Sequence, residues 1–413
     1  DDYIKFIRFA HWKISQTGKG IFGYISNNSY LSGIIHRGMR KELLSTFDEI
    51  YILNLHGSSR IGEKTPEGGK DENVFDIQQG VAIALFVKLE KPLKEKKVYY
   101  ADLWGLRDAK YKYLRRNDVK STDWQELDVY KFEEEFRKTR WSKKYKTGFY
   151  FFTPKSIQEL ITYGNFWGID EIFEEYSSGV ETGKDDKLVG FTPQDKLKVF
   201  GDICNPEITM KDLESHHSLK STSGWKMEDR RIEMFRKGET FAKNNVVQYA
   251  YRPFDTRYTY YCDFLRRAHS ELMEHLLSEN IAIATTRKCP ATNDFGALTS
   301  CFVSDKHFVA DQTYFFPLFL FPNKNEVKRL DEEAIKPERT SNFTDEFLQA
   351  LQEALGTEPP PEEIFYYIYA VLYSPTYRKR YDEFLKIDFP RIPLPTDQEQ
   401  FKNLSERGKE LVE

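Results

Sequence analysis

The stretch DENVFDIQQGVAIALFVK, from Asp71 to Lys88, joins a mostly polar loop to a continuous apolar run. The run from Gly80 to Lys88 has the length and composition of a buried β-strand. The loop before it carries a large aromatic residue, Phe75. This ring either covers the edge of the core or stacks on a flat ligand, and the residues alone leave both explanations open.

The segments before this stretch alternate between helical and strand patterns. Apolar residues at helical spacing predict helices over 3–14 and 36–47. Short apolar runs predict strands over 21–26 and 49–57. The second of these strands and the strand after Phe75 have no helix between them, so they can pair antiparallel. We therefore predict the second half of an α/β sheet, because a doubly wound domain needs further strands in front of it.

The chain beyond residue 149 has a different character. Short aromatic and β-branched runs, separated by turn residues, predict a mixed and strand-rich region. A polar segment over 323–342 predicts a linker. Two helices are expected over 344–356 and 361–385. The segment 389–395, FPRIPLP, is expected to end the fold in an extended conformation.

Composition and charge limit the classes of protein that fit. The 413 residues are 40% hydrophobic and 15% aromatic, which is typical of a well-packed globular protein of two or three domains. No apolar run approaches the roughly 18 residues of a membrane span, and the first residues do not resemble a secretory signal. The net charge of −4 excludes a uniformly basic nucleic-acid binder. Residues 88–148, however, hold 18 basic and 11 acidic side chains, which predicts one positive face.

No cysteine or histidine pattern predicts a metal site. Four cysteines are scattered along the chain, at Cys204, Cys262, Cys289 and Cys301. None forms a C-x-x-C pair or has a histidine at zinc-ligand spacing, so we expect structural thiols in a reducing cytoplasm. The adjacent pair His216 and His217 lacks a third ligand at helical spacing, which favours a surface pair.

The segment GVETGKDD, residues 179–186, looks like a phosphate loop at first sight. Its glycines have the wrong spacing, and Asp185 stands where such a loop carries a metal-binding Ser or Thr. A tight turn is the better interpretation. The pair Asp185 and Asp186 also lacks the E-x-K partner that a nuclease would place on a nearby strand.

The segment YRPFDTRYTYY, residues 251–261, and the following FLRRAH place four arginines among aromatic residues. Arginine can pair with guanine or bind phosphate, and aromatic rings can pack on bases and sugars. The alternative is an aromatic core edge with solvated arginines. Composition alone does not separate these two explanations.

The order of several blocks resembles the adenine-specific DNA methyltransferases that are fused into single-chain restriction–modification enzymes, notably the type ISP group and type IIG-like enzymes. The first blocks resemble the part that follows the catalytic NPPY tetrapeptide: YIKFIRFAHWKI (3–14), GIFGYISNNSYLSG (20–33), HRGMRKELLSTF (36–47), IYILNLHG (50–57) and ENVFDIQQGVAIALFVK (72–88). Later blocks resemble the target-recognition portion: ADLWGLRDAKYKYL (101–114), EIFEEYSSGVETGKDD (171–186), YRPFDTRYTYY (251–261) and FLKIDFPRIPLP (384–395). The resemblance covers nearly the whole chain.

The resemblance implies an α/β fold made of the C-terminal half of a Rossmann-like methyltransferase sheet, a mixed α+β target-recognition domain and a helical C-terminus. The implied parts are the half catalytic domain (1–95), a basic helical connector (96–148), the DNA-binding target-recognition domain (149–325), and a linker with C-terminal helices (326–413). The implied function of the full protein is methyl transfer from S-adenosylmethionine to the exocyclic amine of a flipped adenine. The alternative is a non-catalytic DNA-specificity module that only binds and positions a partner.

The chain departs from this family in one respect. It contains neither an NPPY-type tetrapeptide nor the glycine-rich loop of the cofactor site, and both precede the helix at Tyr3 in family order. We therefore expect a piece of a longer protein that is inactive alone, without catalytic residues, whose S-adenosylmethionine is bound mainly by a missing N-terminal part. The expected partners are double-stranded DNA and the upstream part of the same polypeptide, with nuclease and translocase parts as further candidates. No membrane partner is expected, and the expected location is the bacterial cytoplasm.

The resemblance also implies individual site residues. In related enzymes an aromatic residue before the last antiparallel strand packs on the extruded adenine, and Phe75 matches that position. Asn27 and Asn28 end the preceding strand at its carboxyl edge and would line the same pocket, or form an ordinary polar turn. Arg115 and Arg116, in the basic segment, are predicted to contact phosphates. The residues predicted to read DNA from the strand-rich region are Lys184, Arg252, Arg257, Arg266, Arg267, Arg287 and Lys288.

Overall fold

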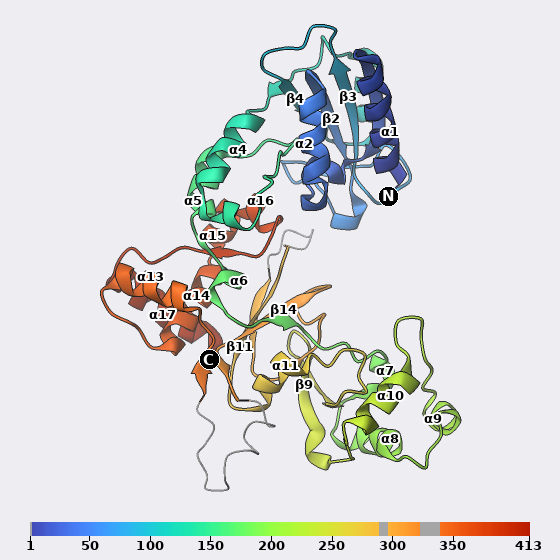
Figure 1. Ribbon diagram of the computed structural model, residues 1–413, viewed down its shortest axis with the longest axis vertical. Coiled ribbons are helices and arrows are strands. Elements are labelled where there is room, and N and C mark those ends of the chain that lie inside the picture. The colour runs from blue at the N-terminus through green and yellow to red at the C-terminus, as the bar shows by residue number, and fades with distance from the viewer. Residues whose placement is uncertain (1, 289–295, 323–338) are drawn as a thin grey trace. The chain divides into compact units, whose positions relative to one another are not determined.

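The computed structural model describes residues 2–288, 296–322 and 339–413 (Figure 1). These residues divide into two compact units. Unit 1 holds residues 2–167 and 381–387, and unit 2 holds the other described residues. Residues 323–338 of the predicted linker, and Cys289, lie outside the described part of the chain.

Unit 1 is built on a five-stranded sheet in the order β1-β3-β2-β4-β5 (Figure 1). Its strands are β1 (Gly20–Asn27), β2 (Glu49–His56), β3 (Val81–Lys88), β4 (Lys97–Asp102) and β5 (Gln125–Glu126). β3 pairs antiparallel with β1 and with β2, which confirms the predicted antiparallel pairing. β2 and β4 run parallel, so their carboxyl ends lie side by side and the sheet continues past residue 95.

Both faces of the central strands β2 and β3 are largely buried, which explains why these strands are continuous apolar runs, whereas β1 alternates between exposed and partly buried residues. On one face, Ile52 and Phe86 share a core with Leu43 of helix α2 (Arg37–Thr46) and Ile7 of helix α1 (Asp2–Thr17). On the other face, Leu55 packs near residues of helix α3 (Arg107–Arg116). The other elements of unit 1 are α4 (Val129–Lys138), α5 (Ile157–Gly164), α16 (Asp382–Leu385) and the short helices η1 (Asn28–Leu31), η2 (Ile34–His36), η3 (Ser59–Ile61) and η4 (Arg140–Lys143).

Unit 2 contains two four-stranded sheets, in the orders β13-β9-β10-β8 and β12-β11-β14-β7. The first consists of β8 (Val189–Gly190), β9 (Val246–Arg252), β10 (Asp255–Tyr260) and β13 (Val303–Ser304). The second consists of β7 (Ser177–Ser178), β11 (Ala282–Thr286), β12 (Ala297–Ser300) and β14 (Thr313–Pro317). One apolar core joins the two sheets and includes Phe200, Trp225, Tyr260 and Phe315.

Short helices surround these sheets. They are α6 (Ile169–Ile172), α7 (Asp185–Leu188), α8 (Gln194–Cys204), α9 (Met210–His217), α10 (Met227–Arg236), η5 (Lys243–Asn245), α11 (Ser270–Met273) and η6 (Glu274–Leu277). Two-residue strands complete the list: β6 (Trp167–Gly168), β15 (Phe319–Leu320), β16 (Thr340–Ser341) and β17 (Arg391–Ile392). The strand-rich region is therefore a mixed α/β region with several small sheets.

The C-terminal part corrects two predictions. The helix predicted over 361–385 is broken into α14 (Pro361–Tyr373), α15 (Pro375–Arg380) and α16, because Pro375 cannot continue the hydrogen bonding of α14. The segment 389–395 does not end the fold, since α17 (Gln398–Val412) follows it. A further helix, α13 (Asp345–Leu355), lies where the sequence predicts one. No helix within the described ranges combines the length and apolar character needed to cross a bilayer.

Candidate functional site

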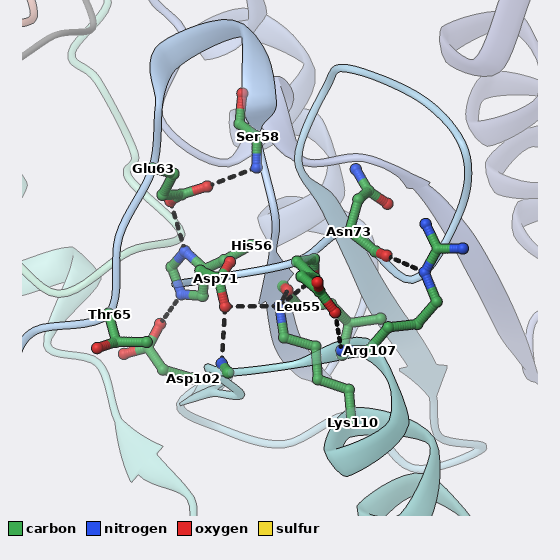
Figure 2. Close-up of polar contacts among 12 residues, drawn as sticks. Leu55, His56, Ser58, Glu63, Thr65, Asp71, Asn73, Asp102, Arg107 and Lys110 are labelled. Carbon is green, nitrogen blue, oxygen red and sulfur yellow. Dashed lines mark hydrogen bonds and ion pairs between the residues drawn. The ribbon is translucent and has the colours of Figure 1, made fainter. Parts of the chain in front are cut away.

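The carboxyl edge of the unit 1 sheet carries a histidine held between two acids. His56 ends β2 and Asp102 ends β4, so the parallel pairing of these strands brings the two residues together. The Nε2 atom of His56 lies 2.7 Å from Asp102, and Nδ1 lies 2.8 Å from Glu63 (Figure 2). The imidazole is buried and stacks on Trp104 with ring centroids 3.3 Å apart. Burial favours neutral His56, but the hydrogen bonds to Asp102 and Glu63 outweigh it and raise the pKa of His56.

A chain of side-chain hydrogen bonds connects this histidine site to the first strand. The amide of Asn28 donates to Asn54 over 3.0 Å, and the amide of Asn54 donates to the Tyr100 hydroxyl over 3.0 Å. Tyr100 in turn donates to Asp102. The predicted pocket residue Asn28 therefore belongs to the same polar network as His56.

Helix α3 holds the loop that carries Phe75. The ammonium group of Lys110 lies 2.7 Å from the Asp71 carboxylate, and both side chains are fully buried. Lys110 also donates to the carbonyl oxygens of Leu55 and Glu72, each over 2.7 Å (Figure 2). This lysine therefore ties the end of β2 to the start of the loop.

The first turn of α3 binds the loop further along. Arg107 donates to the Asn73 carbonyl over 2.6 Å and to the Phe75 carbonyl over 3.1 Å. Tyr111 donates to the Val74 carbonyl. Gly57, at φ 82°, lies so close to Asn73 that a Cβ atom there would clash with the Asn73 backbone. The loop backbone is thus held from two sides.

This arrangement places Phe75 outside the core. Val74 is 3% exposed and fills the core edge, whereas Phe75 is 45% exposed. A ring that is open to solvent on a held backbone is free to receive a flat ligand. The stacking of Phe75 on a base stays a prediction.

The two predicted asparagines have different surroundings. Asn27 accepts a hydrogen bond from the Ser29 amide over 2.7 Å, as a residue of an ordinary polar turn does. Asn28 donates to Asn54, and its backbone amide donates to the Gly80 carbonyl. Asn28 therefore lies beside the start of β3, at the end of the loop that carries Phe75.

In unit 2, the segment from Glu181 to Asp185 gathers several predicted DNA-binding residues. Glu181 forms ion pairs with Arg266 at 3.2 Å and Arg267 at 3.7 Å, and it also pairs with Lys306. Lys184 lies in the same segment as the residue before α7. The supposed phosphate loop is thus a structural turn whose buried carboxylate organises basic side chains.

The hairpin of β9 and β10 carries two more predicted residues. The Tyr251 ring lies between the guanidinium groups of Arg252 and Arg257, at 3.9 and 4.1 Å from its centroid. Arg252 pairs with Asp305 at 2.9 Å, and Arg257 pairs with Asp255 at 2.8 Å. Because Tyr251 donates to Asp185 over 3.1 Å, this hairpin adjoins the segment that contains Lys184.

The remaining predicted residues lie apart from these groups. Arg287 and Lys288 follow β11, and Arg287 pairs with the buried Asp388 at 2.9 Å. Arg115 and Arg116 are exposed in the last turn of α3. Neither forms a hydrogen bond or ion pair with any residue that the structure describes.

The C-terminal part of the chain matches a known protein family. Residues 171–413 match the family model described as "Type ISP C-terminal specificity domain". The chain belongs to this family. The match confirms the predicted resemblance to type ISP restriction–modification enzymes.

Three solved structures have folds similar to that of this chain. The structure of the DrdV–DNA complex is 24% identical, with a TM-score of 0.66, and the match covers 99% of this chain and 39% of that one. The ATP-dependent type ISP restriction–modification enzyme LlaBIII bound to DNA is 23% identical (TM-score 0.70; 100% and 26% covered). A nuclease-deletion mutant of the type ISP enzyme LlaGI with a DNA substrate mimic is 23% identical (TM-score 0.61; 100% and 31% covered). The chain thus spans about a quarter to two-fifths of these proteins. None of the curated proteins matches it.

Other features of the specificity-domain chain lie away from the predicted sites. A cavity of about 490 Å³ in unit 1 is lined by residues of the segments 125–132 and 151–157 and by Glu383, and no predicted site residue lines it. Within the described ranges, no cluster of three or more His, Cys, Asp or Glu side chains is arranged to hold a metal ion. Cys204, Cys262 and Cys301 are free thiols.

The sequence reasoning missed the histidine site and the Lys110–Asp71 pair. His56 and Asp102 are 46 positions apart, and neither lies in a recognisable motif. The only available signal was that each residue ends an apolar strand run. Polar residues at the carboxyl ends of two parallel strands are neighbours, but the parallel pairing of β2 with β4 was not predicted.

Proposed function

We propose that this chain is the DNA-reading portion of an adenine-specific DNA methyltransferase within a fused restriction–modification enzyme. The observation that supports this most strongly is the membership of residues 171–413 in the type ISP specificity family. The similar fold of two type ISP enzymes whose structures contain DNA supports double-stranded DNA as the ligand. Because the chain spans only part of these enzymes, we propose that it acts joined to further segments of its polypeptide.

S-adenosylmethionine is the methyl donor in this proposal. The polar groups at the carboxyl edge of the unit 1 sheet do not fit such a cofactor, because His56 is held by Glu63 and Asp102, and Lys110 by Asp71. The sequence also lacks an NPPY tetrapeptide. In our proposal this chain therefore carries out no transfer step, and other parts of the polypeptide bind the cofactor.

The proposed role of Phe75 is to stack on the flipped adenine. In the full-length enzyme, Phe75→Ala is expected to reduce the rate of methylation by about 5- to 150-fold, because base–aromatic stacking contributes roughly 1–3 kcal/mol. Phe75→Trp should be milder. Methyl incorporation into DNA measures the effect.

Ile77→Ala is the matched control, since Ile77 is an equally exposed apolar residue on the same loop. It should leave methylation unchanged. A Phe75→Ala enzyme that methylates normally but melts at a lower temperature would assign Phe75 to the core edge instead.

Two sets of arginines should have different effects on DNA binding. Replacing exposed Arg115 and Arg116 with alanine is expected to weaken binding to all sequences and to flatten the salt dependence by about one unit per lost phosphate contact. Arg257→Ala or Arg267→Ala should instead reduce discrimination between cognate and scrambled duplexes by roughly 1–3 kcal/mol. Salt titrations of both duplexes measure both effects.

If Arg257→Ala or Arg267→Ala weakens binding to both duplexes equally, other residues read the bases. Arg267 offers the cleaner test, because it is 58% exposed, whereas Arg257 is partly buried against Asp255. A wild-type chain that binds no duplex at any salt concentration would contradict the proposed function itself.

The second candidate function is a DNA-specificity module without a catalytic role, which the description of the matched family favours. Calorimetry separates the two functions. A methyltransferase requires that the full polypeptide binds S-adenosylmethionine and methylates DNA. A pure specificity module binds DNA. It neither binds the cofactor nor transfers a methyl group, whether as this chain or as the full polypeptide.

A further inference from the structure

The tip of the β9–β10 hairpin presents one aromatic ring entirely to solvent. Arg252 and Asp255 are paired across the hairpin, so Pro253 and Phe254 form its two-residue turn. The relative exposure of Phe254 is 101%, the highest among the large apolar residues that the structure describes. Its φ angle is 61°, a conformation that hairpin turns usually give to Gly, Asn or Asp. A bulky apolar residue therefore stands where neither packing nor backbone conformation requires one.

The base of the hairpin holds this tip in place. Arg257 packs on the rings of Tyr251 and Phe191, at 4.1 and 4.6 Å from their centroids. The Tyr251 hydroxyl donates a hydrogen bond to Asp185, and Arg252 forms an ion pair with Asp305. These contacts therefore hold the β-turn that carries the Phe254 ring.

The size of the projecting group identifies the kind of partner. One phenyl ring buries about 150–250 Å², whereas a stable protein–protein interface buries about 1,200–2,000 Å². One projecting ring alone supplies too little area for a protein interface, but it fits the gap that opens when two adjacent base pairs are unstacked. Phenylalanine is among the side chains that proteins insert between base steps.

Charge near the tip is consistent with a nucleic-acid partner. Arg252 and Arg257 flank the turn, Lys184 lies on the adjoining segment 181–185, and Arg267 pairs with Glu181 of that segment. Asp255 and Asp305 balance the formal charge of the two flanking arginines. The tip therefore offers DNA an apolar ring with arginine and lysine side chains nearby, rather than a simple phosphate site.

We propose that Phe254 is a wedge that inserts between two adjacent base pairs of the DNA duplex and unstacks them. This rests on the proposed DNA-binding function. Insertion replaces base–base stacking with base–ring stacking and bends the duplex. Pyrimidine–purine steps such as TA and CA unstack most easily. The wedge thus selects a deformable step at one position of the target without a hydrogen bond to any base.

The test uses the full chain and a duplex that the chain itself selects from a random-sequence pool. 2-Aminopurine replaces one base at successive positions, because its fluorescence rises when it loses its stacking partners. The wild-type chain is expected to raise the fluorescence at one step. Phe254→Gly should abolish that rise and lower affinity by about 5- to 150-fold, and Phe254→Trp should retain it.

Two controls separate the wedge from other effects. Phe254→Gly is expected to keep the fold, since glycine adopts the positive φ readily and the lost ring has no buried surface. Ile232→Ala removes another exposed apolar side chain, 60% exposed, on helix α10 outside the hairpin, and should leave the fluorescence rise intact.

The outcomes distinguish the two proposals. A rise that persists in Phe254→Gly, or tight binding by the wild type without a rise at any step, overturns the wedge and leaves DNA binding intact. A wild-type chain that enriches no duplex from the pool overturns DNA binding and the wedge together.

Discussion

Lys110→Met is expected to lower the free energy of unfolding of unit 1 by about 3–5 kcal/mol, because it leaves the buried carboxylate of Asp71 without its counter-ion. Both side chains are fully buried, and one Asp71 oxygen already lacks a hydrogen-bond partner within the described structure. The Leu55 and Glu72 carbonyls would lose a donor as well. Urea unfolding followed by hydrogen exchange in peptides from β2 and α3 reports on unit 1 alone.

Lys112→Met provides the matched control, since it makes the same change at an exposed position of the same helix. Its effect should stay within about 0.5 kcal/mol. Adding Asp71→Asn to Lys110→Met should recover part of the loss, because the unpaired charge is removed. Equal effects of the two lysine variants would mean that the buried pair adds little to stability.

The Lys110 variant also has an expected functional consequence. Lys110 anchors the start of the loop that carries Phe75, so its loss should increase hydrogen exchange in residues 71–79. If Phe75 stacks on a base, methylation by the full-length enzyme should then fall even at temperatures where unit 1 remains folded.

His56→Gln is expected to remove a pH-dependent contribution to the stability of unit 1. The pKa of His56 is raised above its ordinary value of 6.5, because the hydrogen bonds to Asp102 and Glu63 outweigh the effect of burial. A raised pKa means that the folded state binds the proton more tightly than the unfolded state. The contribution is therefore complete below pH 6.5 and is lost as the pH rises through the pKa of the folded protein.

Glu63 sets the acid limit of this contribution. Burial alone would raise its pKa, but the hydrogen bonds from His56 and the Ser58 amide lower it below the ordinary 4.5. Stability from Glu63 is thus present above pH 4.5 and is lost as the pH falls through its lowered pKa. The His56–Glu63 pair should be strongest between about pH 4.5 and 6.5.

Unfolding measured from pH 5 to pH 9 tests this expectation. Wild type should lose stability in unit 1 above pH 6.5, and His56→Gln should be less stable by about 1–3 kcal/mol at pH 5.5, since Glu63 and the partly exposed Asp102 lose their shared partner. The gap should narrow as the pH rises. His216→Gln, at an exposed histidine of unit 2, is the control. Parallel curves for wild type and His56→Gln would show that folding does not change the pKa of His56.

Local pattern was sufficient for the first elements of the chain. The strands β2 and β3 and the helices α1 and α2 are segments whose apolar spacing matches their period, and their burial follows from it. The antiparallel pairing of β2 with β3 was predictable because the sequence shows no helix pattern between the two strands. Pro375 marks the break in the predicted long helix and was visible in the sequence, but the apolar run across it outweighed that signal.

The last helix shows how a weaker pattern was missed. α17 buries only Phe401, Ser405 and Gly408, and two of these are not apolar. The helix packs on α14 so closely that a Cβ at Gly408 would clash with the Tyr366 carbonyl. The contact between α17 and α14 depends on close approach of the two backbones. A search for periodic apolar residues does not detect such a contact.

The sequence by itself determined the α/β character of residues 1–88 and the position of Phe75 in the loop before an apolar strand. Only the tertiary structure decided that His56 lies between Asp102 and Glu63, that Lys110 is buried against Asp71, and that Arg252 and Arg257 pack on one tyrosine. The physical reason is that apolar burial depends on a local period along the chain. Polar pairing instead depends on strand order and register, which bring residues that are distant in sequence to the same edge of a sheet.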